Sequence, residues 1–267
     1  MKRQPGIGLR LAPLAAASSL SFFIGIAAGL LGVGGGEFRL PILICMLGFS
    51  VAVAAAANLI VGIMTVCVSL VKRLAAGVFD PAVLPLIIFM SLGSIAGAYA
   101  GAKLTDRVSE NRLKCAVGVL LVLLGLKFIH GGLTGEIAST PVAGYPIDLV
   151  LGAVLGTLIG IVCGSLGVAG GELRIPALVY LFGMSTKGAG TASLFVSLPA
   201  VVAGALKHGR MGHVDRGVFC TCIAMGLPAV IGAYLGAALV PGTAEAVLKM
   251  LLGIVLLLAA VRMVIKH

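Results

Sequence analysis

The chain contains long runs of apolar residues that carry few or no charges. The most prominent are residues 82–102, 113–129, 149–169, 185–206, 217–240 and 247–265. A helix needs about 20 apolar residues to cross a hydrocarbon core of roughly 30 Å, and most of these runs approach that length. Only 10% of the 267 residues are charged, whereas a soluble domain carries about a quarter. The sequence therefore predicts an all-α polytopic membrane protein.

The two halves of the chain repeat each other at a constant offset, with Gly25 falling on Gly160. GIAAGLLGVGGGEFRLPIL (Gly25–Leu43) aligns without a gap with GIVCGSLGVAGGELRIPAL (Gly160–Leu178). Roughly a third of the pairs along the first copy are identical, which is more than shared apolar composition explains. The predicted organisation is a cytoplasmic N-terminal segment 1–16, a first membrane repeat 17–132, a linker 133–148 and a second membrane repeat 149–267.

Each copy opens with an element that has two interpretations. An apolar run of about 15 residues leads to a glycine cluster, and a second short apolar arm follows it; neither arm crosses a bilayer alone. As one broken span, this element gives four crossings per copy and parallel copies. As a re-entrant hairpin, it gives three crossings per copy and inverted copies.

The distribution of basic residues favours inverted repeats, because positive charges gather on the cytoplasmic side. With a cytoplasmic N-terminus, twelve basic residues lie inside and four outside, leaving aside Lys187 and the two motif arginines. Those inside are Lys2, Arg3, Arg10, Lys103, Arg107, Arg112, Lys114, Lys207, Arg210, Arg216, Arg262 and Lys266; those outside are Lys72, Arg73, Lys127 and Lys249. The prediction is two inverted repeats, each a re-entrant or broken glycine-rich helical hairpin plus three transmembrane helices. Both termini would be cytoplasmic, in the inner (plasma) membrane. The N-terminus resembles a signal peptide, but it runs directly into the repeated motif, so we expect it to be retained.

The glycine clusters interrupt the opening element at equivalent places. Near-consecutive glycines followed by Pro41 or Pro176 are unfavourable for a continuous helix. One interpretation is close helix packing. The other is an unwound segment whose backbone amides meet an anion, as in inverted-repeat transporters. The candidate binding residues at the breaks are Gly34, Gly35, Gly36, Ala169, Gly170 and Gly171.

Charged residues follow each break in otherwise apolar surroundings. Glu37 and Arg39 recur as Glu172 and Arg174. Ionisable residues at membrane depth are candidates for function. The arginines would complement an oxyanion, and the glutamates would carry a coupling proton. The alternatives are that these charges only lock the hairpins together, or that they reach the headgroups.

Polar residues also occur on the span after each hairpin. Asn58 and Ser193 occupy equivalent positions, with Thr191 and Ser197 nearby in the second copy and Thr65 in the first. Lone hydroxyls in such helices commonly bond to their own helix backbone, whereas a buried amide needs a partner. Asn58, Thr191 and Ser193 are the candidate side-chain contacts.

Other classes of function find little support. The basic residues form no stripe with interleaved aromatics, so nucleic-acid binding is not indicated. The six cysteines show no metal or disulfide framework. No catalytic triad or nucleotide motif is present, so we expect no enzyme activity, no cofactor and no metal.

The doubled motif resembles that of the TauE/SafE sulfite-exporter-like permeases. GLLGVGGGEFRLP and GSLGVAGGELRIP, with GAGTASL at 188–194, carry the resemblance, which covers essentially the whole chain. It implies an inner-membrane permease for small sulfur-containing anions such as sulfite, sulfoacetate or related organosulfonates. The sequence departs from the family pattern at Ala169, and at the Glu and Arg residues that follow the glycines.

The resulting hypothesis is a secondary transporter that holds a small anion between two glycine breaks and works by alternating access. Coupling to protons or sodium, and assembly as a homodimer, remain open. The rival hypotheses are a passive anion channel, a non-transporting scaffold or sensor, and a cation or metal permease that uses Glu37 and Glu172.

Overall fold

The computed structural model describes residues 11–104, 110–135, 142, 144–166 and 169–265. These residues form helices and no strand. The elements are α1 (Leu11–Leu31), α2 (Gly36–Pro41), η1 (Ile42–Met46), α3 (Val51–Ala75), η2 (Pro81–Val83), α4 (Leu84–Leu104), α5 (Glu110–Thr134), α6 (Ile147–Leu166), α7 (Gly171–Tyr180), α8 (Thr186–Arg210), α9 (Arg216–Leu239) and α10 (Glu245–Ile265). The prediction of an all-α protein is confirmed for the described part of the chain.

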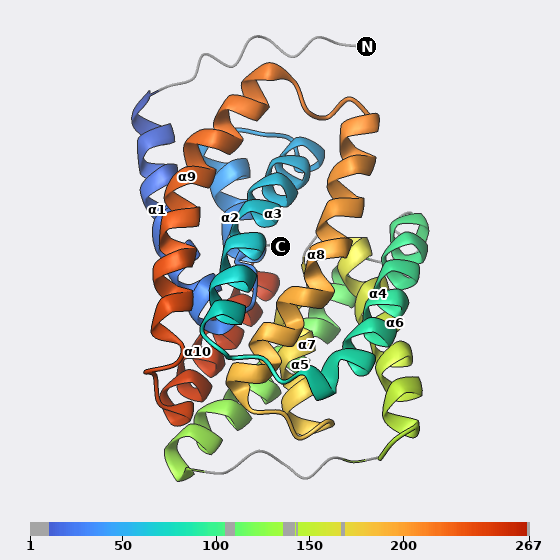
Figure 1. Cartoon of the computed structure of the whole chain (residues 1–267). Coiled ribbons are helices and arrows are strands. Elements are labelled where there is room, and N and C mark those ends of the chain that lie inside the picture. Colours follow the sequence, from blue (N-terminus) through green and yellow to red (C-terminus); the bar gives the residue numbers. More distant parts are fainter. Residues whose placement is uncertain (1–10, 105–109, 136–141, 143, 167–168, 266–267) are drawn as a thin grey trace.

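Each half of the chain opens with a helical hairpin. In Figure 1, α1 begins near the top and runs downward, and α2 with η1 returns toward the end where α1 began. Helix α6 begins near the bottom and runs upward, and α7 returns downward. The long helices α3 and α8 then run through the molecule in opposite directions. The glycine breaks are therefore the turns of two hairpins that begin at opposite ends of the bundle.

The first arm of each hairpin is longer than the sequence suggested. Helix α1 has 21 residues and α6 has 20, against the expected run of about 15. Helix α1 begins at Leu11, and Pro13 is tolerated in its first turn because the missing amide hydrogen is not needed there. The second arms are short, with 10 residues in α7. These second arms are too short to cross a bilayer.

Glycines allow two pairs of helices to pack with their backbones in contact. A Cβ atom at Gly25 or Gly29 of α1 would collide with the backbone of α9, and one at Gly97 or Gly101 of α4 would collide with the backbone of α6. The offset between the copies relates α1 to α6 and α9 to α4, so the same packing occurs twice. Each pair takes one helix from each half, and the two halves are therefore intertwined.

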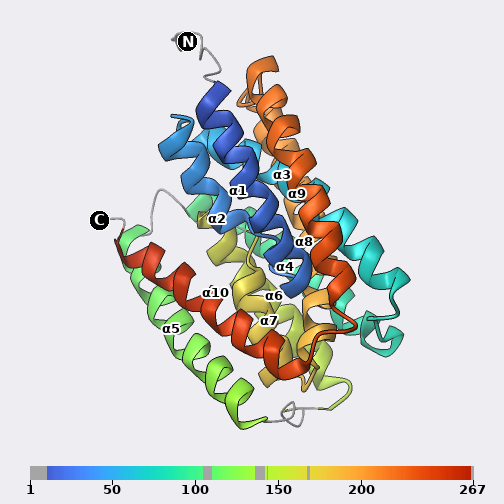
Figure 2. The ribbon, with the colours of Figure 1, turned by 90° about the vertical axis from the view of Figure 1, so that its left-hand side faces the viewer.

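The remaining surface of the bundle is apolar. Helices α5 and α10 lie side by side along one face (Figure 2), and large side chains such as Leu92, Leu123 and Phe23 are more than half exposed. Six helices are long and apolar enough to cross a membrane: Ala12–Leu31, Val51–Ala75, Pro81–Gly101, Val117–Thr134, Thr186–Arg210 and Arg216–Leu239. An outward-facing apolar surface on such helices is typical of a protein solvated by lipid.

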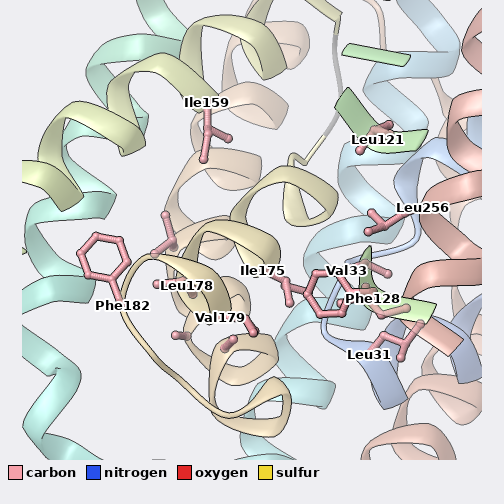
Figure 3. Close-up of a cluster of buried hydrophobic side chains, with 14 of the residues drawn as sticks. Leu31, Val33, Leu121, Phe128, Ile159, Ile175, Leu178, Val179, Phe182 and Leu256 are labelled. Carbon is pink, nitrogen blue, oxygen red and sulfur yellow. The ribbon is translucent and has the colours of Figure 1, made fainter. Parts of the chain in front are cut away.

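The interior contains a cluster of aliphatic and aromatic side chains drawn from both halves. Leu31 and Val33 from the first hairpin lie near Ile175 of α7 and Phe128 of α5 (Figure 3), in a cluster that also contains Leu178. Burial of these side chains anchors the short arm of the second hairpin. The hairpin turns are thus held by packing on all sides.

Part of the charge pattern can be located. Arg73 is fully buried and Lys249 is 4% exposed, so neither is the solvated charge that the count of outside residues assumed. Five of the counted residues lie outside the described part: Lys2, Arg3, Arg10, Arg107 and Lys266. The side chains of Lys103, Arg112, Lys114 and Arg262, and parts of segments 1–16 and 133–148, also lie outside it.

We expect Gly97→Ala to destabilise the protein because the added methyl group forces α4 away from α6, at a cost of about 1–3 kcal/mol. Gly62→Ala is the matched control, because a Cβ atom at that buried helical glycine meets nothing within 4 Å. Alanine there should stabilise the helix by up to about 1 kcal/mol. The midpoint of thermal unfolding in lipid nanodiscs measures both. Equal midpoints for the two variants would contradict the close packing of α4 on α6.

Candidate functional site

The chain turns at each break through glycines in the left-handed backbone region. Gly34 has φ 87°, and Gly35, which precedes α2, has φ 69°. Gly170 occupies the same position before α7 with φ 76°. Residues with a Cβ atom adopt this conformation only with strain. The glycines are therefore required by the turn itself and are not only packing residues.

The two breaks touch each other. A Cβ atom built on Gly34 would lie 3.6 Å from Cβ of Ala169, and one built on Gly171 would lie 2.6 Å from the carbonyl oxygen of Val33. Segments that are far apart in the sequence thus meet inside the bundle. Of the six residues that the sequence placed at the breaks, Gly34, Ala169 and Gly171 make these contacts, whereas Gly35, Gly36 and Gly170 face side chains of their own copy.

Arg39 holds the first break to the helix that follows it. Its side chain is fully buried, and its guanidinium donates to the carbonyl oxygen of Gly34 at 3.1 Å and to Oδ1 of Asn58 at 3.4 Å. The Asn58 amide also lies against Gly36, where a Cβ atom would be 2.8 Å from Nδ2. Arg39 therefore braces the turn, and Asn58 lies beside the break as the sequence indicated.

Arg174 makes the equivalent contact and reaches further. It is fully buried, and Nη1 donates to the carbonyl oxygen of Ser193 at 3.4 Å and to Oγ of Ser197 at 2.7 Å. Nη2 donates to Oγ of Ser94 on α4 at 3.2 Å. Arg174 thus joins the second break to α8 and to a helix of the first half.

Two donors beside the second break are buried without a hydrogen-bond partner among the described residues. They are Nε of Arg174 and Oγ of Ser193, and Ser193 is itself fully buried. At the first break, Nε of Arg39 is likewise buried without a hydrogen-bond partner among the described residues. A buried polar group that lacks a partner costs about 1–3 kcal/mol. These groups are therefore the ones best placed to donate hydrogen bonds to a ligand.

The glutamates lie among these arginines. Glu37 and Glu172 are each 4% exposed, and Glu37 interacts electrostatically with Arg39 and with Arg174 of the other half. Oε1 of Glu172 has no hydrogen-bond partner in the described part of the chain. The charges of one break thus act on the other.

The remaining candidates divide into two groups. Thr191 belongs to a different set of contacts. Its hydroxyl accepts from Nη1 of Arg73 at 3.0 Å and makes no hydrogen bond to either motif arginine in the described part of the chain. Thr65 donates to the carbonyl oxygen of Val61, four residues earlier, at 3.1 Å, which is the local role expected of a lone threonine.

Two residues at the site were missed by the sequence analysis. Ser94 is an isolated serine in a helix rich in small residues, and no motif marks it. Arg73 follows Lys72 at the end of a span and reads as an interfacial charge, yet it is fully buried and donates to α1 and α8. A serine or arginine whose partner lies on another helix leaves no periodic signal in the sequence.

The Sulfite exporter TauE/SafE family model matches residues 2–128 and 138–267 of the chain. The chain belongs to the TauE/SafE sulfite exporter family. The unmatched stretch between the two segments overlaps the start of the predicted linker. The resemblance seen in the doubled motif is confirmed.

Curated relatives are named as transporters. The chain is 25% identical to the probable membrane transporter protein YunE of Bacillus subtilis over 65% of this chain and 67% of that protein. It is 27% identical to a probable membrane transporter protein of Xylella fastidiosa over 72% of each chain. It is 21% identical to the probable membrane transporter protein YjnA of Bacillus subtilis over 92% of this chain and 97% of that protein. No solved structure gives a significant match. Together with the six apolar helices, these matches identify a multi-pass membrane transporter of the TauE/SafE family.

We expect Ser197→Ala to lower the free energy of unfolding by about 1–3 kcal/mol, because the buried Arg174 guanidinium loses a charge-assisted hydrogen bond. Thr65→Val is the control, since that hydroxyl bonds only to carbonyls of its own helix, and it should change stability by less than about 0.5 kcal/mol. Unfolding in nanodiscs followed by circular dichroism provides the comparison. An unchanged stability in Ser197→Ala would show that Ser197 does not hold Arg174.

Proposed function

We propose that this TauE/SafE transporter carries small anions of the sulfur oxyanion or organosulfonate class, such as sulfite or sulfoacetate, by alternating access. The observation that carries the proposal is the meeting of two glycine breaks, each followed by a fully buried arginine. Among the described residues around the breaks, Arg39, Arg73 and Arg174 outnumber Glu37 and Glu172 by one positive charge. A buried net positive charge in a water-poor interior favours an anion as the visiting species.

The two arginines support different roles in binding. Arg39 has two of its donors occupied by Gly34 and Asn58, so it mainly fixes the shape of the first break. Arg174 is surrounded by serine hydroxyls, and its Nε atom and the hydroxyl of Ser193 are available as donors. We place the anion at Arg174 and Ser193, with the backbone amides of residues 34–36 and 169–171 facing it.

The relation between the two halves supports alternating access. The hairpins begin at opposite ends of the bundle (Figure 1), and the glycine-packed pairs α1–α9 and α4–α6 are related by the offset between the copies. We infer two inverted repeats that are joined by these two helix pairs, each of which contains one helix from each repeat. The anion would bind between the repeats. In such transporters, one half rocks against the other around a fixed site.

The rival functions find less support. A cation or metal permease would need acidic groups in excess, and the buried charges around the breaks have the opposite balance. A passive channel needs a continuous path, whereas the backbones of the two breaks are in direct contact. A scaffold or sensor would not need left-handed glycine turns at both equivalent positions.

We infer an inner-membrane location with both termini cytoplasmic. Because Arg73 and Lys249 are buried within the protein, they do not act as solvated outside charges, and the excess of basic residues on the inside becomes larger. Glu172, which has an unpartnered oxygen among the described residues, is the candidate carrier of a coupling proton, and no residue of the described part singles out sodium.

Uptake into proteoliposomes tests the proposal. We expect uptake of labelled sulfite or a sulfonate that is competed by the other sulfur anions and not by divalent metals. Uptake should be accelerated by an imposed proton gradient and should fall at least about tenfold in Arg174→Lys, since a lysine cannot reproduce the planar fork of donors. Comparing proton and sodium gradients identifies the coupling ion. Flux that ignores both gradients would favour a channel, and the absence of transport for every sulfur anion would overturn the substrate class.

Gly35→Ala tests whether the break itself is needed for transport, once the effect of backbone strain is controlled for. Alanine at φ 69° is strained by about 1–2 kcal/mol and also meets Cγ2 of Ile24 at 2.7 Å. Gly77→Ala is the matched control, because Gly77 has φ 68° with nothing within 4 Å. We expect Gly35→Ala to lose transport by about tenfold or more and Gly77→Ala to stay within about twofold, with both variants folded. Equal transport by the two variants would remove the break from the mechanism.

A further inference from the structure

One buried arginine joins both halves of the transporter away from the two motif arginines. Nε of Arg73, on the last turn of α3, donates to the carbonyl oxygen of Gly29 at 3.0 Å, and Nη2 donates to that of Leu30 at 2.7 Å. Nη1 donates to Oγ1 of Thr191 at 3.0 Å and to the carbonyl oxygen of Lys187 at 3.1 Å. A single guanidinium therefore bonds α3, the end of α1 and the beginning of α8.

The acceptors on α1 are available because that helix ends at Leu31. The last carbonyls of a helix have no partner within it, and a basic side chain near the C-terminus can satisfy them. The helices are also in backbone contact here, because a Cβ atom at Gly32 would collide with the backbone of Gly190, and one at Gly190 would meet Nη1 of Arg73 at 2.8 Å. Arg73 thus joins the end of α1, just before the first break, to the start of α8 by hydrogen bonds.

The same end of α8 makes further contacts. The amide of Thr186 donates to the Glu245 carboxylate, and Nζ of Lys187 donates to the carbonyl oxygen of Pro241 at 2.9 Å. The rings of Phe79 and Phe195 lie with their centroids 4.9 Å apart. The ends of α3 and α1 and the start of α8 lie toward the bottom of Figure 1.

The opposite end of the bundle cannot form this arrangement. The offset between the copies places His208 at the position equivalent to Arg73, Ala56 at that of Thr191 and Ala52 at that of Lys187. Nδ1 of His208 lies 3.0 Å from Nδ1 of His213 in the following loop. The repeat is therefore broken at the three positions that make the contact around Arg73.

We propose that Arg73 is a positioning residue that fastens one end of the transport path, and that its bonds to α8 open and re-form in each transport cycle. The proposal rests on the proposed alternating-access function. Its geometry divides the bonds into two sets: those to Gly29 and Leu30 stay with the first hairpin, and those to Lys187 and Thr191 are the ones released when α8 moves. Under the inferred orientation, this end faces the outside of the cell.

The Arg73→Lys variant keeps the charge and removes the fork, since one ammonium group cannot reach acceptors on α1 and α8 together. Arg73→Met removes the charge as well. Lys72→Met is the matched control, because it removes a neighbouring cation that lies over the Tyr234 ring at 5.0 Å and that makes no hydrogen bond to α1 or α8 among the described residues. Thr191→Val removes one of the four acceptors and should give an effect of the same kind and smaller size.

Hydrogen exchange of the full-length protein in nanodiscs, read by mass spectrometry, tests the proposal without any assumption about cargo. We expect amides in segments 28–34 and 186–194 to exchange about tenfold faster in Arg73→Lys, the factor that follows from losing hydrogen bonds to a charged donor. Segment 117–134 in the same variant, and all segments in Lys72→Met, should exchange as in the wild type. Unchanged exchange in segment 186–194 would overturn the proposal. Exchange that rises evenly over every helix would also overturn it, because that result would show that Arg73 stabilises the whole fold and does not hold α8 in particular.

Transport kinetics provide a second readout. Because Arg73 does not contact the proposed anion position, Arg73→Lys should change the maximal rate of sulfite uptake by about fivefold or more and leave KM within about twofold. A raised KM at an unchanged maximal rate would contradict a positioning role. If the wild type transports none of the sulfur anions, the proposed substrate class fails, while the exchange experiment still decides whether Arg73 fastens α8.

Discussion

Backbone groups inside a membrane protein must find partners within the protein, and the two interrupted hairpins place irregular backbone in the middle of the bundle. The structure meets this constraint with arginines. Arg39 takes the carbonyl of Gly34, Arg73 takes the last carbonyls of α1, and Arg174 takes the carbonyl of Ser193. The charges are thus part of how the breaks can exist, and a guanidinium that satisfies a carbonyl still contributes positive potential to an adjoining anion site.

The intertwining of the halves follows from the same requirement. Helices in lipid gain little from apolar burial and instead pack where small residues let backbones approach. The glycine faces of α1 and α9, and of α4 and α6, supply that contact twice. These pairs are closely packed, while the guanidinium of Arg73 joins α1 to α8 by the hydrogen bonds that we propose to open in the transport cycle. A transporter needs both a firm scaffold and a contact that can open. In our account, glycine-mediated helix packing provides the scaffold, and the hydrogen bonds of Arg73 provide the contact that opens.

Much of this arrangement was readable from the sequence, and the remainder depended on partners far away in the chain. Apolar run lengths gave the helices, and the constant offset gave the equivalence of Asn58 and Ser193, both of which contact the arginine that follows their break. The length of α1 was underestimated, since the helix begins at Leu11 and has 21 residues. Arg73 and Ser94 were missed because their hydrogen-bond partners on α8 and α7 lie 114 and 80 residues away along the chain. Whether the breaks serve transport was a prediction from pattern and stays one that experiment must decide.

The most direct test of the central claim is the anomalous signal of selenium in a structure of the protein grown or soaked with selenite, a heavier analogue of sulfite. The account predicts a peak where the two breaks meet, within hydrogen-bonding distance of Nε of Arg174 and Oγ of Ser193. A protein that binds selenite elsewhere, with these two donors still unoccupied, would contradict it.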